Sequence, residues 1–149
     1  MNNRFKFRVW MKTGEIFMDA FESVLLEICD VDEIDFDGGR VHATPPSNMS
    51  GYAASDINDC VLMQCTGLAD KNGKLIYEGD IVEVPPGFSG DGYHDRCIAI
   101  VKWDGQHSCP GYYLYNPHDK YGVVGQDEFR WGVLSIIGNA YENKELLDK

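Results

Sequence analysis

The stretch LMQCTGLADKNGKLIYEGDIV, residues 62 to 82, alternates short apolar runs with turn signals. Asn72-Gly73 is the strongest short hairpin signal in the chain, because both residues tolerate the positive φ angles of a tight turn. Glu78-Gly79-Asp80 marks a second sharp turn, and the apolar residues on either side of it favour buried strands. The stretch therefore predicts short strands joined by tight turns, at residues 61–65, 74–77 and 81–84.

The polar residues of this stretch are predicted to shape its backbone, because Asp and Glu carboxylates accept backbone N–H bonds in such turns. The alternative interpretation is a ligand or metal site formed by Asp70, Glu78 and Asp80. The full set of candidate turn residues is Gln64, Gly67, Asp70, Gly73, Tyr77, Glu78, Gly79 and Asp80.

Short strands continue on the C-terminal side. Cys97 to Trp103 is a strong strand that ends at Asp104-Gly105, and further strands are expected at residues 112–115 and 132–137. Many short strands at a spacing of about 8–12 residues indicate a sandwich or small barrel. The glycine-rich run at residues 87–92 lacks the Lys-Ser/Thr pair of a phosphate-binding loop, so we expect a surface loop there.

The N-terminal side begins with Arg4 to Arg8, where bases alternate with aromatics at the period of a half-buried strand. Gly14 is expected to turn the chain into a second strand at residues 15–18. Apolar residues at helical spacing then predict a short helix over residues 19–30, with Asp19 as its N-cap. Alternation returns at residues 31–36, and Gly38-Gly39 predicts a hairpin into residues 40–43.

Residues 44–56 contain two prolines, serines and a glycine without periodicity, and we expect a loop there. This loop would separate an N-terminal β-rich segment, residues 1–57, from a C-terminal domain, residues 58–149, although both could form one continuous fold. The expected fold class is mainly β with little helix.

Charge and cysteine usage narrow the functional classes. The net charge of −11 disfavours binding to nucleic acid, whose partners usually carry a basic footprint. Five cysteines at irregular spacing, no signal peptide and no apolar run of about 20 residues predict a cytoplasmic protein with free thiols. Nine acids and no Lys or Arg lie between Glu15 and Asp37. They predict a solvated face or a surface for a basic partner, with candidate residues Glu27, Asp30, Asp32 and Asp35.

The stretch quoted first resembles the central block of the YopX family of phage and prophage proteins, Q-x-T-G-L-x-D-x-N-G-x-x-I-Y-E-G-D-I-V. Phe7-Arg8-Val9-Trp10 is similar to the family's F-R-A-W start. Residues 137–147, IGNAYENKELL, resemble its I-G-N-I-Y-E-N-P-E-L-L ending, with Lys144 in place of proline. The resemblance implies a mainly β fold with a C-terminal SH3-type barrel, a phage or prophage origin, and expression in a bacterial cytoplasm. It does not supply an activity or a set of catalytic residues.

His94, Cys97, His107 and Cys109 form the cluster most suggestive of a metal site. Structural zinc needs four N or S ligands, usually in pairs at knuckle spacing, and these mixed pairs do not match that pattern. Cys97 also begins an apolar strand, where a thiol behaves as a small hydrophobe. Nothing in the sequence brings a Cys–His or carboxylate pair together for catalysis. We therefore expect no cofactor and no enzymatic site.

The run Tyr112-Tyr113-Leu114-Tyr115, with aromatics at 121, 129 and 131, could stack on the bases of a single strand. Few basic residues lie nearby in the sequence, so these aromatics are more typical of a core or a protein interface. Tyr112, Tyr113 and Tyr115 therefore join the acids as candidate interaction residues.

The leading functional hypothesis is a non-enzymatic, protein-binding accessory protein of phage origin. The alternatives are an acidic inhibitor of a host nucleic-acid-binding protein, and a metal-dependent module or enzyme that uses the Cys and His residues. We expect an unidentified protein partner, no membrane and no nucleic acid, and a homo-oligomer because small barrels leave unpaired strand edges.

Overall fold

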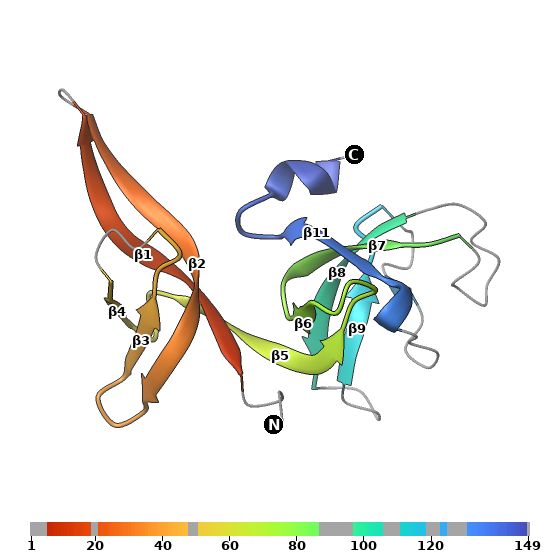
Figure 1. Ribbon diagram of the computed structural model, residues 1–149, viewed down its shortest axis with the longest axis horizontal. Coiled ribbons are helices and arrows are strands. Elements are labelled where there is room, and N and C mark those ends of the chain that lie inside the picture. The colour runs from red at the N-terminus through yellow and green to blue at the C-terminus, as the bar shows by residue number, and fades with distance from the viewer. Residues whose placement is uncertain are drawn as a thin grey trace. The chain divides into compact units, whose positions relative to one another are not determined.

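The computed structural model describes residues 6–18, 21–47, 51–86, 97–105, 111–118, 123–124 and 131–148. Of residues 14–18, 21–24, 123–124 and 131, only the backbone is described. Within these ranges the strands form two antiparallel sheets, which confirms the mainly β prediction (Figure 1). The described strands do not close into a barrel, so the expected SH3-type barrel is not confirmed.

Contacts divide the chain into two compact units, which we call the N-terminal unit, Phe5–Gln64, and the C-terminal unit, Cys65–Lys149. The division falls inside strand β5 (Val61–Ala69), which pairs with β1 through its first residues and with β6 through its later ones. No helix in the described ranges is long and apolar enough to cross a membrane.

The N-terminal unit is built from a sheet with the strand order β4-β3-β2-β1-β5. Val9, Met11, Cys29, Val41 and Ala43 are buried in its core, together with Ala53. The expected hairpin through Gly38 is confirmed, since β2 and β3 pair from Asp30↔Thr44 to Asp35↔Arg40. The strands run over β1 (Phe7–Met18), β2 (Phe21–Asp35), β3 (Arg40–Thr44) and β4 (Ala53–Asp56).

The predicted helix over residues 19–30 is wrong, because β2 occupies this stretch from Phe21 onward. The predicted turn at Gly14 is also wrong, since β1 continues through it with a register irregularity between Lys12 and Gly14. These two errors have one cause. A β1 that runs on to Met18 offers β2 a backbone partner from Phe21 to Asp30, and this tertiary pairing overrides the weak local helix preference.

The expected loop at residues 44–56 is correct only in part. Its last residues form β4, which pairs with β3 in the register Arg40↔Asp56 to Ala43↔Ala53. Ala53 is buried and reaches the core, so a short strand with small residues escaped a search for periodicity.

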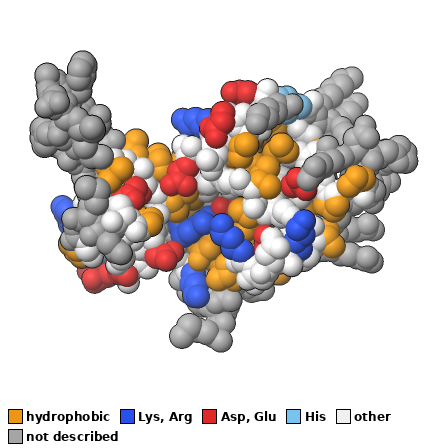
Figure 2. Space-filling view, turned by 45° about the horizontal axis from the view of Figure 1, so that its top comes forward, with side chains coloured by type: hydrophobic (Ala, Val, Ile, Leu, Met, Phe, Trp, Pro, Cys, Tyr) orange, Lys and Arg blue, Asp and Glu red, His pale blue; other side chains and the backbone are white. Residues whose placement is uncertain are grey.

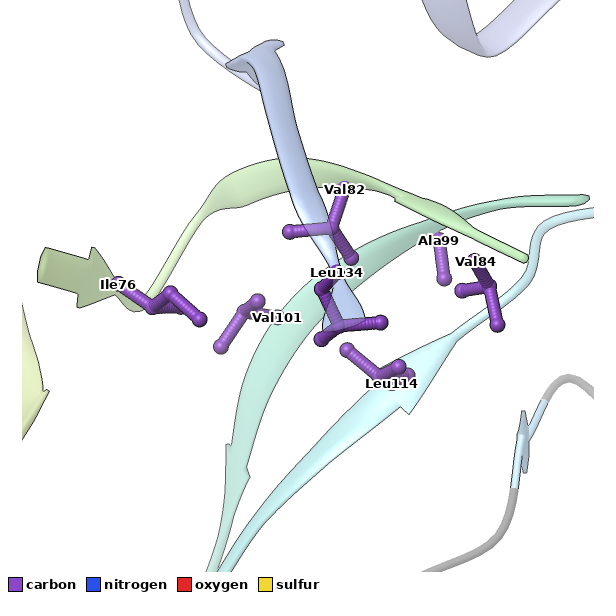
Figure 3. Close-up of a cluster of buried hydrophobic side chains, with 7 residues drawn as sticks. All are labelled: Ile76, Val82, Val84, Ala99, Val101, Leu114 and Leu134. Atoms are coloured by element: carbon purple, nitrogen blue, oxygen red, sulfur yellow. The ribbon is translucent and has the colours of Figure 1, made fainter. Parts of the chain in front are cut away.

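The C-terminal unit contains a five-stranded sheet in the order β10-β9-β8-β7-β11. The strands predicted from the opening stretch and from residues 97–103 and 112–115 are confirmed. Its core side chains are drawn in Figure 3: Ile76, Val82, Val84, Ala99, Val101, Leu114 and Leu134. The elements are β6 (Leu75–Tyr77), β7 (Asp80–Val84), β8 (Cys97–Asp104), β9 (Gly111–Tyr115), β10 (Val123–Val124), β11 (Ser135–Asn139) and the 3-10 helices η2 (Trp131–Val133) and η3 (Lys144–Asp148).

Candidate functional site

Asp70 is a buried carboxylate that organises the turn between β5 and β6. Its Oδ1 accepts the backbone N–H groups of Asn72 and Lys74, each at 2.9 Å. Its Oδ2 accepts the backbone N–H of Ile136 at 3.2 Å and the side-chain amide of Asn72 at 3.3 Å. Burial raises the pKa of Asp70, but the backbone N–H bonds from Lys74, Ile136 and Asn72 outweigh it and hold this pKa below its ordinary value.

Asp80 plays a similar part at the turn between β6 and β7. Its Oδ2 accepts the N–H of Tyr77 at 2.8 Å, and its Oδ1 accepts the side-chain amide of Asn139 at 3.3 Å. Gly79 has a φ of 83°, which residues with a Cβ rarely adopt. Its N–H donates to Val101 and its carbonyl accepts from Ala140, at 2.8 and 2.9 Å. This turn therefore joins β7, β8 and the end of β11.

The C-terminal motif meets this turn through Asn139 and Asn143. Asn143 Oδ1 accepts the N–H of Asn139 at 3.1 Å, and the N–H of Asn143 donates to the Asn139 carbonyl at 2.8 Å. Gly138 leaves room for this arrangement, because a Cβ on it would lie 2.8 Å from both Asn143 Oδ1 and Leu146 Cδ1 and would displace those side-chain ends. Asp70, Asp80 and Asn139 thus connect the central motif to the C-terminal motif.

The other residues of the central motif lie at turns or along the strands of the C-terminal unit and its neighbour β5. Gly67 has a φ of 81° at the register irregularity of β5, between Cys65 and Ala69, and Gly73 has a φ of 80° in the Asp70–Lys74 turn. Tyr77 is buried, whereas Gln64 is exposed and Glu78 is partly buried. Among the residues that the structure describes, no group of three or more His, Cys, Asp or Glu side chains is placed to hold a metal ion.

The candidate acids of β2 fall on different faces of the N-terminal sheet. Glu27 is two residues from the buried Cys29 and therefore lies on the same face of β2, the core side. It accepts hydrogen bonds from Thr13 Oγ1 at 2.5 Å and from Ser47 Oγ at 2.9 Å. The Thr13 bond lowers the pKa of Glu27, burial raises it, and the Ser47 bonds lower it, so that the net direction is down. Glu27 therefore ties Ser47 to β2.

The other acids lie on the opposite face, which we call the outer face. Asp30, Glu33 and Asp35 stand across from Thr44, His42 and Arg40 of β3, which alternate with the buried Val41 and Ala43. Asp32 lies at the register shift of β2 and accepts a hydrogen bond from Thr44 at 2.8 Å. On the side of the molecule shown in Figure 2, acidic side chains are interspersed with basic and hydrophobic ones.

Phe36, at the tip of the β2–β3 hairpin, was not among the predicted site residues. Its side chain is 78% exposed, between the acids Asp35 and Asp37. The tip is ordered by the Gly38 N–H, which donates to Asp35 Oδ1 at 2.9 Å, and by Gly39 with a φ of 65°. The sequence signal was an aromatic residue placed directly before Gly38-Gly39, where a turn was already expected.

The candidate tyrosines lie on β9 and are partly buried. Tyr112 packs edge-on against Trp103 at a centroid distance of 5.0 Å, and Trp103 is 49% exposed. Tyr115 lies on the other face of the sheet, with Lys102 Nζ 4.1 Å from its ring centroid. Burial raises the pKa of Tyr113, and the negative charge of Asp104 raises it further. The sequence had indicated Tyr112 as a candidate interaction residue but not Trp103, which is the exposed member of this aromatic pair.

Several predicted chemical groups lie outside the described residues, namely His94, His107, Cys109, Tyr121, Phe129 and the run at 87–92. Cys97 is partly buried at the start of β8. It lines a pocket of about 240 Å³ together with Ile98, residues 116–118, Leu146 and Leu147. His118 Nε2 lies 2.6 Å from the Leu147 carbonyl in the same region.

Comparison with known protein families finds one that covers nearly the whole chain. The family described as YopX protein matches residues 6–148. This chain belongs to the YopX family. The YopX match spans both units, and the connected motif residues Asp70, Asp80 and Asn139 lie within it.

One solved structure, that of protein EF1440 from Enterococcus faecalis, is similar to this YopX-family chain with a TM-score of 0.50 and 23% sequence identity. The similarity covers 95% of this chain and 96% of that one, and it supports the fold alone. No curated protein sequence matches.

Proposed function

We propose that this YopX-family protein is a non-enzymatic, phage-derived accessory module that binds a protein partner through the tip and outer face of its β2–β3 hairpin. The observation that carries the proposal is the exposure of Phe36, at 78%. Burial of apolar surface is the main favourable contribution to most protein–protein association. Aromatic side chains are also common among the residues that dominate binding energy at protein interfaces.

The ordered hairpin tip supports this proposal. The Asp35–Gly38 hydrogen bond fixes the turn, and the Ile57 N–H donates to the Gly39 carbonyl at 2.8 Å. A turn whose backbone is already fixed loses little backbone freedom on binding, which leaves more of the burial energy for affinity.

The charges around Phe36 indicate the chemistry of the partner. Asp35 and Asp37 flank the ring in sequence, and Asp30, Asp32 and Glu33 line the hairpin behind it. The partner is therefore expected to have an apolar pocket rimmed by Lys or Arg. Such a charged rim would speed association and make the affinity sensitive to salt.

Matched affinity capture from the native bacterial host tests the proposal. Tagged wild type would be compared with Phe36→Ser and with Leu68→Ser, which removes another exposed apolar side chain, 42% exposed, from the C-terminal unit. We expect one specific protein with wild type and Leu68→Ser, its loss with Phe36→Ser, and weaker recovery at high salt. Equal recovery with all the variants, or none at physiological salt, would contradict the proposal.

A further inference from the structure

Among the strands that the structure describes, β11 pairs with β7 alone and therefore forms one edge of the five-stranded sheet. In an antiparallel pair, alternate residues direct their backbone N–H and C=O groups toward the partner and away from it. The Ala140 N–H donates to the Gly79 carbonyl, which fixes this alternation at the end of the strand. Leu134, Ile136 and Asn139 therefore direct backbone groups away from β7, toward the open edge.

Four of these outward groups are already bonded within the chain. At the start of β11, the Leu134 carbonyl accepts the N–H of Lys71 at 2.9 Å, and the Ile136 N–H donates to Asp70 Oδ2 at 3.2 Å. At its end, both the N–H and the C=O of Asn139 bond to Asn143, at 3.1 and 2.8 Å. The two motifs of the sequence thus close the two ends of one strand edge.

Ile137 lies between these two bonded ends of the strand. It stands at the register irregularity of β11, and its side chain is 38% exposed. An uncapped edge strand with an exposed apolar residue is a template for another strand, and proteins block such edges with irregularities and side chains. A two-fold axis through Ile137 would let β11 pair antiparallel with the same strand of a second molecule.

We propose that Asp70 and Asn143 are edge caps, which prevent a second copy of this chain from adding its β11 to the sheet. Self-association, expected from unpaired edges, would then not use this edge while the caps are in place. The inference rests on no residue of the β2–β3 hairpin, and it therefore stands or falls independently of partner binding.

The proposal is tested with the double variant Asp70→Asn, Asn143→Ala. Asp70→Asn keeps the shape of the side chain but replaces one of its acceptor oxygens with an amide that cannot accept a backbone N–H. Asn143→Ala removes the Oδ1 that accepts the Asn139 N–H, and it keeps the backbone N–H that bonds to the Asn139 carbonyl. We expect the molar mass from light scattering to double as protein concentration rises, whereas wild type keeps a constant mass. Asn143→Asp is the matched control, because it retains Oδ1 and is expected to behave as wild type.

Adding Ile137→Lys to the double variant identifies the surface, since a charge at the edge should restore the wild-type mass. Hydrogen exchange provides a second measurement. The Ile136 and Asn139 amides should lose protection at low concentration and regain it at high concentration, which simple destabilisation would not produce. If the double variant does not fold, Asn143→Ala alone carries the same measurement at Asn139.

A folded double variant with the wild-type mass at every concentration would overturn the proposal. Association that persists unchanged after Ile137→Lys would overturn it too, because the contact would then lie elsewhere.

Discussion

At the scale of single residues, Tyr112 carries a buried hydroxyl oxygen that has no hydrogen-bond partner in the part of the chain that the structure describes. Burial, then the charges of Glu78 and Cys65, raises the pKa of Tyr112 to about 12. The folded protein therefore retains the phenolic proton at pH values where the unfolded chain, with a pKa of about 10, has lost it.

This predicts a stabilising substitution. Tyr112→Phe should increase the free energy of unfolding by about 1 kcal/mol at neutral pH, because it removes an unsatisfied buried hydroxyl. It should also reduce the loss of stability between pH 10 and about 12, where only the unfolded chain ionises. Denaturant unfolding at neutral and alkaline pH checks both, with Tyr115→Phe as the control. A loss of stability at neutral pH would mean that the hydroxyl has a partner.

Asp70 illustrates how far sequence reasoning reaches at a single site. Its bonds to Asn72 and Lys74 were predictable, because Asp side chains accept N–H groups two to four residues ahead in tight turns. Its bond to Ile136 joins residues 66 positions apart and depends on where β11 lies in the sheet. Phe36 was missed for a different reason, since an alternating pattern assigns residues to faces and says little about a turn tip.

At the scale of secondary structure, strands with strong turn signals were predicted well and β2 was not. Residues 61–84 carry Gly and Asn at the turns, so local chemistry and pairing agree. Within residues 19–30 the apolar spacing favoured a helix, while the long partner β1 favoured a strand. Pairing prevailed because it satisfies backbone hydrogen bonds throughout the stretch from Phe21 to Asp30.

Glu27 shows how β2 also fixes the segment that follows β3. Glu27→Gln should lower stability by at most about 1 kcal/mol at neutral pH, since the bonds from Thr13 and Ser47 go to a charged carboxylate that solvent partly screens. Because the folded-state pKa of Glu27 is lowered, its contribution exists above the unfolded pKa and disappears as the pH falls through the folded value. The difference between wild type and Glu27→Gln should therefore shrink in acid.

Urea unfolding from neutral to acidic pH measures this difference. Glu33→Gln, on the outer face, is a suitable control because Glu33 stands opposite His42 and away from Ser47. A difference that stays constant at every pH would contradict the role given to the Glu27 carboxylate.

At the scale of the whole molecule, the two units have separate cores with no residue in common. Met11→Ala and Leu134→Ala should each cost about 2–5 kcal/mol, the usual range for large-to-small changes at buried sites. Met11→Ala should lower hydrogen-exchange protection first in β1–β4, and Leu134→Ala first in β7–β9. Equal loss of protection throughout the chain in both variants would show that the cores unfold together.

Strand β5 has a consequence for synthesis on the ribosome. The β1 strand is paired by β2 on one side and by residues 61–64 of β5 on the other. Its second side therefore stays open until Gln64 has left the exit tunnel, long after β2 is available. Nascent chains shorter than this should be the ones that chaperones hold and proteases cut.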